Sequence, residues 1–314
     1  MNQHDKNRYR IVIAGLGGVG GYLGTKLVNR YSEDDSYEIV FFQRGEHLQQ
    51  IRRNGLKYIT KNNEHIAVPS IATDNPRTLG PIDLAILCVK SYDLKSCTKM
   101  LKKNLGEKSV VISALNGVNN GAMLKRILPD SSILDGCIYI SAAILKPGII
   151  KQTGGVGQFI FGPEDGNIKP FEKIETILKN AGIKAELNPN ISTHLWEKYI
   201  FVCSLATLTS LHKESIGSIV ASEKKRNTWI NLMEEIIYIA QAQNIPISDS
   251  IIDSCIKRAQ TIPYNTKTSM QIDVESGRKT EIDIFTQYIV KSANKLDVHV
   301  PCHEKAYYKL KVKC

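Results

Sequence analysis

Glycines near the start of the sequence are spaced as in loops that bind a dinucleotide. The segment RIVIAGLGGVG, residues 10–20, reads G-x-G-x-x-G between an apolar run predicted to be a strand and a predicted helix. In this setting Gly15 permits the tight turn, Gly17 lets the backbone approach a pyrophosphate, and Gly20 lets helix and strand pack closely. The loop residues between them, also expected at the cofactor, are Leu16, Gly18 and Val19. The motif therefore predicts dinucleotide binding, with an ordinary glycine turn as the alternative.

The end of the second predicted strand indicates which dinucleotide binds. An NAD site has an acidic residue there that holds the ribose 2′-hydroxyl. This sequence has FFQRG at 41–45, with no acid and with Arg44 at the tip. Because a guanidinium pairs with phosphate through two parallel hydrogen bonds, Arg44 suits a 2′-phosphate. We expect NADPH as the cofactor, and a solvent-exposed arginine without a role is the alternative.

Two further polar residues follow predicted strands, where ligands bind in open α/β sheets. Lys90 ends the apolar run LAILCVK, and Asn116 with Gly117 ends VVISAL. Lys90 and Asn116 are therefore candidates for contact with a ligand. Taken alone, each is more often a surface lysine or a turn.

The pattern of apolar runs predicts an α/β protein with a Rossmann-type, doubly wound parallel sheet followed by an all-helical domain. The expected strands lie at 9–14, 38–43, 82–89, 109–115 and 183–187, with several short β pieces within 133–161. The expected helices lie at 18–30, 95–105, 170–181, 192–211, 223–243, 249–260 and 281–296, and a last one begins at Pro301. We place the boundary between an NADP-binding domain, 1–188, and a helical substrate and catalytic domain, 189–314.

The composition argues against several other classes of protein. The seven cysteines are odd in number and none are spaced C-x-x-C, so neither a disulfide framework nor a zinc or other metal site is indicated. The first ten residues are polar and no apolar run approaches the roughly 18 residues of a membrane span, which predicts a cytoplasmic protein without membrane contact. The net charge of +10 is scattered, so nucleic-acid binding is not expected.

Motifs along nearly the whole chain resemble those of the ketopantoate reductases, the 2-dehydropantoate 2-reductases. Besides the glycine turn, they are Arg44-Gly45, Val89-Lys90, Asn116-Gly117, Trp196-Glu-Lys198, Leu208-Thr-Ser-Leu211, Ser269-Met-x-x-Asp273 and Gly277-Arg-x-Thr-Glu281-Ile-Asp283. The resemblance implies hydride transfer from NADPH to the ketone carbon of a small 2-oxo acid. The product would be a 2-hydroxy acid, with ketopantoate reduced to pantoate in pantothenate biosynthesis as the named case.

The resemblance also implies a role for each matching residue. Lys198 would be the general acid, and Glu281 would hold the reacting hydroxyl and the lysine while contacting the cofactor. Ser269 would help bind the substrate carboxylate, and Lys90 and Asn116 would line the cofactor and substrate cleft. The chemistry is consistent, because a lysine ammonium supplies both a proton and a cation to the developing alkoxide. A homodimer also occurs in such proteins and is an open expectation here.

The sequence departs from the family where substrate-binding asparagines are expected on the helix of the lysine. Val202 and Ala206 stand four and eight residues after Lys198, and Ile216 stands near a third such place. Either the substrate is a different, less polar 2-oxo acid, or other side chains supply the contacts. The candidates for such contacts are Asn190, Ser204, Thr207 and Thr209. A non-catalytic NADPH-binding regulator is a further alternative, although keeping Lys198, Ser269 and Glu281 argues against it.

Overall fold

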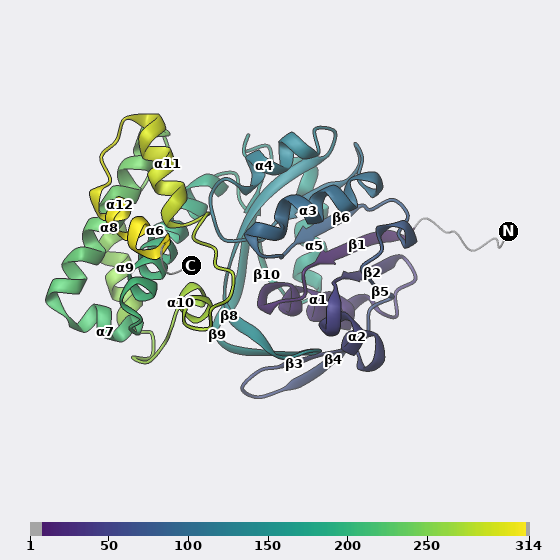
Figure 1. Cartoon of the computed structure of the whole chain (residues 1–314). Coiled ribbons are helices and arrows are strands. Elements are labelled where there is room, and N and C mark those ends of the chain that lie inside the picture. The colour runs from purple at the N-terminus through teal and green to yellow at the C-terminus, as the bar shows by residue number, and fades with distance from the viewer. Residues whose placement is uncertain (1–7, 312–314) are drawn as a thin grey trace. The chain divides into compact units, whose positions relative to one another are not determined.

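The computed structural model describes residues 8–311 and separates the chain into two compact units (Figure 1). The first unit is Met1–Leu115 with Asn119–Ile191, and the second is Asn116–Val118 with Ser192–Cys314. The expected cytoplasmic location rests partly on the polar start of the sequence. Most of that segment lies outside the described residues, as does Cys314. Each unit is described by itself below.

Six parallel strands form the centre of the first unit, in the order β5-β2-β1-β6-β7-β8. Their bounds are β1 Tyr9–Ala14, β2 Tyr37–Phe42, β5 Ile71–Thr73, β6 Leu84–Leu87, β7 Val110–Ser113 and β8 Ser132–Lys146. Because β1 lies between β2 and β6, the strand order reverses beside it, which is where doubly wound sheets bind their ligands. The expected α/β fold with a Rossmann-type sheet and a helical second part is confirmed.

The sheet continues beyond β8 through strands of mixed direction. They are β9 Ile149–Gly162, antiparallel to β8, then β3 Leu56–Ile59, β4 Glu64–Ala67 and β10 Lys184–Leu187. The prediction of several short pieces within 133–161 is wrong, because two long strands fill this region. Bulges in the β8–β9 pairing and positive φ values at Gly155 and Gly157 accommodate the glycines without ending the strands.

Helices cover both faces of the sheet because its central strands are apolar on both sides. Ile11 and Ile13 pack in one core with α1 Gly18–Tyr31, α2 Gly45–Asn54 and α5 Glu172–Asn180. Val12 and Ala14 point into the opposite core with α3 Ser91–Leu101 and α4 Asn120–Ile127. Short 3-10 turns lie at Pro76–Thr78, Lys102–Asn104 and Lys169–Phe171. The sequence reasoning missed α2, α4 and the short strands β3, β4 and β5.

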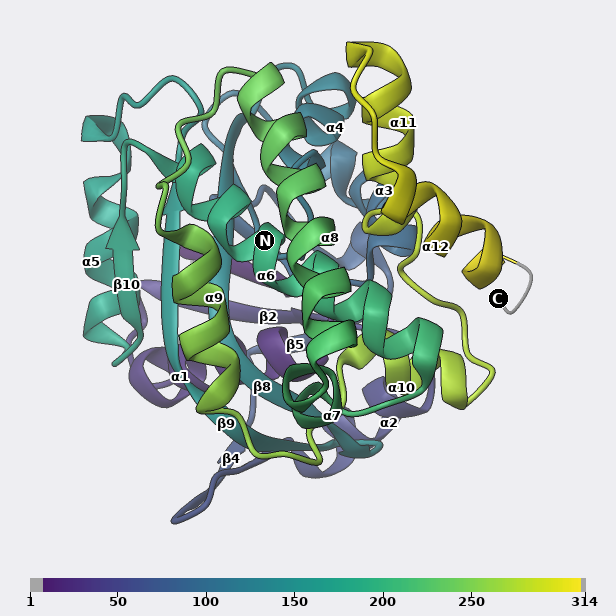
Figure 2. The ribbon, with the colours of Figure 1, turned by 90° about the vertical axis from the view of Figure 1, so that its left-hand side faces the viewer.

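The second unit is built from helices (Figure 2). They share one apolar core, which includes Trp229 and Ile200. The helices are α6 Ile191–His212, α7 Ile216–Ala221, α8 Glu223–Ala242, α9 Ile251–Gln260, α10 Ser269–Glu275, α11 Thr286–Leu296 and α12 Pro301–Lys311. The predicted start of α11 at Glu281 is wrong. The carbonyl oxygens of Ile284 and Phe285 accept the Tyr199 hydroxyl, and α11 begins only at Thr286. Within residues 8–311, no helix is long and apolar enough to span a membrane.

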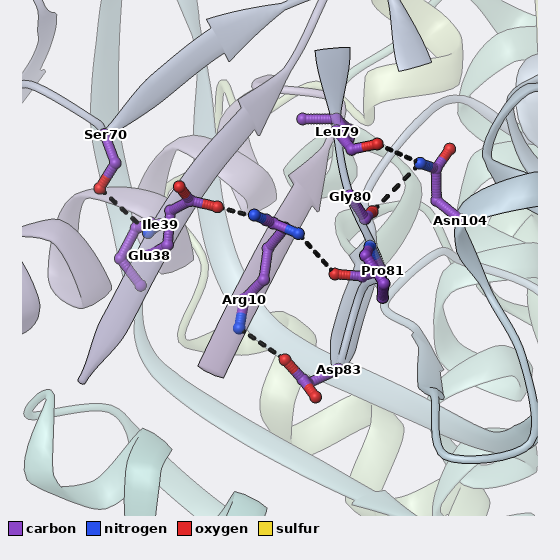
Figure 3. A network of polar contacts seen from close by, with 9 residues as sticks. All are labelled: Arg10, Glu38, Ile39, Ser70, Leu79, Gly80, Pro81, Asp83 and Asn104. Atoms are coloured by element: carbon purple, nitrogen blue, oxygen red, sulfur yellow. Dashed lines mark hydrogen bonds and ion pairs between the residues drawn. The ribbon is translucent and has the colours of Figure 1, made fainter. Parts of the chain in front are cut away.

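A polar network joins central strands of the sheet at their amino ends, and the glycine turn follows the other end of β1 (Figure 3). The Arg10 guanidinium binds the Glu38 carboxylate on β2 and donates to the Pro81 carbonyl oxygen at 2.7 Å. The backbone N–H of Arg10 also donates to the Asp83 carboxylate at 2.7 Å. Arg10 therefore ties together the amino ends of β1, β2 and β6.

We expect Arg10→Ala to lower the free energy of unfolding by about 1–3 kcal/mol, because partly buried polar partners lose their hydrogen bonds. The NADPH affinity should not change, since the glycine turn lies at the other end of β1. Thermal and denaturant unfolding followed by circular dichroism measures the effect. Arg8→Ala is the matched control, because Arg8 pairs with a fully exposed Asp35 and should cost about 0–1 kcal/mol. Equal losses in the two variants would contradict the role given to Arg10.

Candidate active site

Backbone crowding explains why glycines are needed in the turn between β1 and α1. Gly15 has φ +90°, and a Cβ there would lie 2.7 Å from the backbone nitrogen of Val89. A Cβ at Gly20 would lie 1.9 Å from the carbonyl oxygen of Gly15. The N–H of Gly15 donates to the Phe42 carbonyl oxygen at 2.9 Å. The turn is thereby fixed against β2 and the segment that follows β6.

The opposite side of the turn is open, and its chemistry fits a pyrophosphate. A Cβ at Gly17 would have no other heavy atom within 4 Å. Gly17 caps α1 without any side-chain hydrogen bond, and the first turn of α1 contains no acidic residue. The positive end of the helix is therefore not compensated by a residue of its own first turn, which suits phosphate oxygens.

Leu16, the second residue of the turn, is held by two side chains that sequence reasoning missed. Its N–H donates to Oε1 of Gln43 at 3.1 Å, and its carbonyl oxygen lies 2.9 Å from Nε2 of His47. The side chain of Leu16 is fully buried in the core of the first unit, so it anchors the turn there. The only hint in the sequence is that Gln43 and His47 flank Arg44 in the segment QRGEH.

Arg44 lies at the surface where β2 ends, as the 2′-phosphate hypothesis requires. Its side chain is 74 % exposed and its Nη2 lies 2.7 Å from the carboxylate of Asp93 on α3. Lys90 directly precedes α3 and is partly buried. Since it follows β6, it lies beyond the carboxyl ends of the strands, as Arg44 does after β2. An exposed ion pair contributes only about 0–1 kcal/mol, and a phosphate can therefore replace Asp93 at little cost.

In the second unit, the structure brings Lys198 and Asn116 together. Nζ of Lys198, on α6, donates to Oδ1 of Asn116 at 3.0 Å, and both side chains are partly buried. Gly117 takes φ +104°, which lets the chain turn directly after Asn116. The amide oxygen of Asn116 therefore orients the ammonium group of Lys198.

The loop that carries Glu281 is anchored to the helix turn that carries Lys198. Tyr199 donates its hydroxyl to the carbonyl oxygens of Ile284 and Phe285 at 2.7 and 3.1 Å. Burial raises the pKa of Tyr199 well above its ordinary value, so the donor keeps its proton. Glu281 is 6 % exposed and lies three residues before this anchor.

Ser269 occupies the first position of α10 and is exposed. The preceding Thr268 accepts the backbone N–H of Gln271 at 3.2 Å and bonds to the hydroxyl of Thr209 on α6 at 2.8 Å. These contacts fix the start of α10 to the same helix that carries Lys198. The backbone of Ser269 is therefore positioned through the neighbouring Thr268, and its side chain is open to solvent.

The face of α6 that follows Lys198 is apolar. Val202 is partly buried and Ala206 is 1 % exposed, and both pack against the helical core. Val118, two residues after Asn116, is another partly buried residue against this core. The surroundings of Lys198 and Asn116 in this unit thus include hydrocarbon side chains.

The hydroxyl groups considered as substitutes for the family's asparagines are used inside the protein. Ser204, Thr207 and Thr209 are all fully buried. Ser204 accepts the indole N–H of Trp229 at 2.8 Å, and Thr207 bonds to Thr286 at 2.8 Å. Asn190 is exposed and belongs with the first unit. The three hydroxyls therefore stabilise helix packing.

The site residues proposed from the sequence form two groups. The glycine turn, Arg44 and Lys90 belong to the first unit, and the second unit holds Asn116, Lys198, Ser269 and Glu281. Among residues 8–311, no cluster of three histidine, cysteine, aspartate or glutamate side chains could hold a metal ion. The chemistry available is thus phosphate binding in one group, and ammonium, amide, hydroxyl and carboxylate groups in the other.

Comparison with known proteins identifies the class that this fold and these residues define. Residues 11–166 match the family described as ketopantoate reductase PanE/ApbA, and residues 190–313 match its C-terminal domain. The chain belongs to the ketopantoate reductase family. It is an oxidoreductase that uses a nicotinamide dinucleotide, and its reaction is of the 2-hydroxy acid dehydrogenase kind.

Individual relatives align over almost their full length. The oxidoreductase YkpB of Bacillus subtilis is 26% identical over 96% of this chain and 98% of its own. The 2-dehydropantoate 2-reductase of Halobacterium salinarum is 25% identical over 93% of this chain and 94% of its own. The crystal structure of a PanE/ApbA family ketopantoate reductase from Ralstonia eutropha superposes with a TM-score of 0.88 at 25% identity, covering 97% and 98%.

We expect Arg44→Ala to weaken NADPH binding by about ten- to a hundredfold, the value of one charge-assisted contact to phosphate. NADH binding should change little, because NADH lacks the 2′-phosphate. Fluorescence titration with each cofactor measures the two affinities. Arg53→Ala, at an exposed position in the last turn of α2, the helix that begins directly after Arg44, is the control for charge loss. Equal losses for the two cofactors would contradict the assignment.

Proposed function

We propose that this protein reduces a 2-oxo acid to the 2-hydroxy acid with NADPH, and that 2-dehydropantoate is its substrate. The observation that supports this most directly is the bond between Lys198 and Asn116 beside the loop of the buried Glu281. The relatives named as 2-dehydropantoate 2-reductases support the choice of substrate. A role in pantothenate biosynthesis, a cytoplasmic location and a homodimer belong to the same proposal.

In this proposal NADPH supplies the hydride to the ketone carbon, and the chain's own residues manage charge and protons. Lys198 donates a proton to the carbonyl oxygen as that oxygen gains charge, and Asn116 orients the ammonium group. Glu281 keeps the lysine charged and in place. Ser269 helps hold the substrate carboxylate, and Arg44 with the glycine turn binds the phosphates.

The apolar face of α6 supports a second candidate, a 2-oxo acid without the hydroxyl group of 2-dehydropantoate. Val202 and Ala206 provide no hydrogen bond to such a group, and a pocket without a partner discriminates poorly for a hydroxyl. The matched pair 2-dehydropantoate and 3,3-dimethyl-2-oxobutanoate differs only in that hydroxyl. Steady-state kcat/KM for the two acids decides between the candidates.

We expect Lys198→Ala to lower kcat by about 10²–10⁴-fold, the usual contribution of a general acid. The NADPH dissociation constant should barely change, because the lysine acts on the substrate carbonyl. NADPH oxidation and cofactor titration measure the two quantities. Lys224→Ala removes an exposed lysine from α8 and is the control. Near-normal turnover of Lys198→Ala would refute the assignment, and NADPH binding without turnover of any 2-oxo acid by the wild type would favour a non-catalytic regulator.

Introducing an amide on the α6 face should change substrate preference. We expect Val202→Asn to raise the ratio of kcat/KM for 2-dehydropantoate over its deoxy analogue about tenfold, which corresponds to one hydrogen bond. Val202→Leu, which adds volume without a polar group, should not raise it. The same ratio in the two variants would show that this face does not contact the part of the substrate that carries the hydroxyl.

A further inference from the structure

The imidazole of His47 joins the glycine turn to a second element of the same unit. His47 lies on α2 and is 7 % exposed. Its Nε2 lies 2.9 Å from the carbonyl oxygen of Leu16, and its Nδ1 lies 2.9 Å from the backbone nitrogen of Gly148, in the turn between β8 and β9. One buried ring therefore contacts the cofactor loop and the tip of a hairpin.

The two partners define the protonation state of the ring. The backbone N–H of Gly148 can only donate, so Nδ1 of His47 must accept and carries no proton. The carbonyl oxygen of Leu16 can only accept, so Nε2 must carry the proton and donate. The neutral ring satisfies both contacts, whereas the doubly protonated ring would place two donors 2.9 Å apart at Gly148.

The β8–β9 hairpin packs so closely against the start of α1 that side chains at Gly18 and Gly21 would clash with it. A Cβ at Gly18 would lie 1.9 Å from the carbonyl oxygen of Ala142 on β8. A Cβ at Gly21 would lie 2.7 Å from the side chain of Ile150 on β9. The hairpin thus supports the residues whose N–H groups would face the pyrophosphate, and a shift of its tip would be transmitted to the turn.

We propose that neutral His47 is a positioning residue that holds the phosphate-binding turn in its binding geometry, and that a second proton on His47 weakens NADPH binding. The inference rests on the proposed use of NADPH. His47 acts through Leu16, whose N–H is fixed by Gln43 and whose carbonyl oxygen is fixed by His47. Loss of the contact at Nδ1 releases the hairpin tip from the turn.

The surroundings of His47 favour the neutral form at neutral pH. Burial lowers the pKa of His47 below its ordinary value, and the bond to the Leu16 carbonyl opposes this shift without cancelling it. The charged residues on α2 are Glu46, Arg52 and Arg53, those on β8 and β9 are Asp135, Lys146 and Lys151, and Lys57 on β3 pairs with Glu64. Because the pKa is lowered in the folded protein, the stabilising contact is present at neutral pH and is lost as the pH falls through that lowered value.

The test is NADPH affinity as a function of pH in variants that separate geometry from charge. The amide of His47→Gln can donate and accept as the neutral ring does, but it does not titrate. We expect it to bind NADPH at about pH 8 within a few-fold of wild type, and to lack the added loss of affinity that wild type shows as the pH falls through the lowered pKa of His47. His47→Leu should bind at least about tenfold more weakly across this range, for want of the hydrogen bonds.

Two controls keep the result interpretable. The 2′-phosphate itself titrates at about pH 6 and affects both proteins alike. The test therefore compares the pH profiles of NADPH affinity of wild type and His47→Gln. His65→Gln removes an exposed histidine on β4 and should keep the wild-type profile. Calorimetric titration measures binding without turnover. Absence of NADPH binding by wild type would refute the proposed function, whereas binding with the same profile in His47→Gln would overturn only this inference.

The state of the ring can be read without any substitution. Nitrogen chemical shifts of His47 in the wild-type protein should report the tautomer protonated at Nε2, with titration below the ordinary histidine value of about 6.5. The pH at which the NADPH affinity of wild type begins to fall, after correction for the titration of the 2′-phosphate, should match the pH at which the ring titrates. A ring protonated at Nδ1, or a break at a different pH, would overturn the proposal even if the variants fail to fold.

Discussion

The main constraint on this fold is the lack of space for side chains around the turn after β1. Gly15 lies against the backbone of residues 88–89, Gly20 lies against the carbonyl of Gly15, and Gly18 lies against Ala142. These contacts set the start of α1 where the strand order reverses. The side of the turn at Gly17 stays open, and Arg44 lies just after the end of the neighbouring β2.

The second unit meets a different requirement, which is to hold a charged lysine at a defined point of a mostly apolar helix. Asn116 binds the ammonium group of Lys198, and the neighbouring Tyr199 fastens the loop that follows Glu281. The polar residues further along α6 serve packing, as the buried bonds of Ser204 and Thr207 show. The polar pair of Lys198 and Asn116 therefore belongs to a unit with an apolar core, and the apolar residues Val202 and Ala206 follow Lys198 along α6.

Much of this arrangement could be predicted from the sequence because local signals carry it. The glycine spacing, the acid missing at Arg44 and the apolar runs each depend on neighbouring residues alone. His47 and Gln43 could not be found in this way, since their partners in the turn are about thirty residues away. The late start of α11 was missed because Tyr199, far away in sequence, binds the carbonyl oxygens of residues 284 and 285. The glycines in β8 and β9 were wrongly predicted to separate short strands. The bulges that accommodate them depend on how the two strands pair, which the local sequence does not show.

The central claim is that Lys198 protonates the carbonyl oxygen of a 2-oxo acid in an NADPH complex. A crystal structure with NADPH and oxamate, an unreactive 2-oxo acid analogue, tests it most directly. The account predicts that Nζ of Lys198 lies at about 3 Å from the oxamate oxygen that replaces the ketone, with the nicotinamide ring against the adjacent carbon. A fully occupied complex in which Lys198 points into solvent, away from the analogue, would contradict the claim.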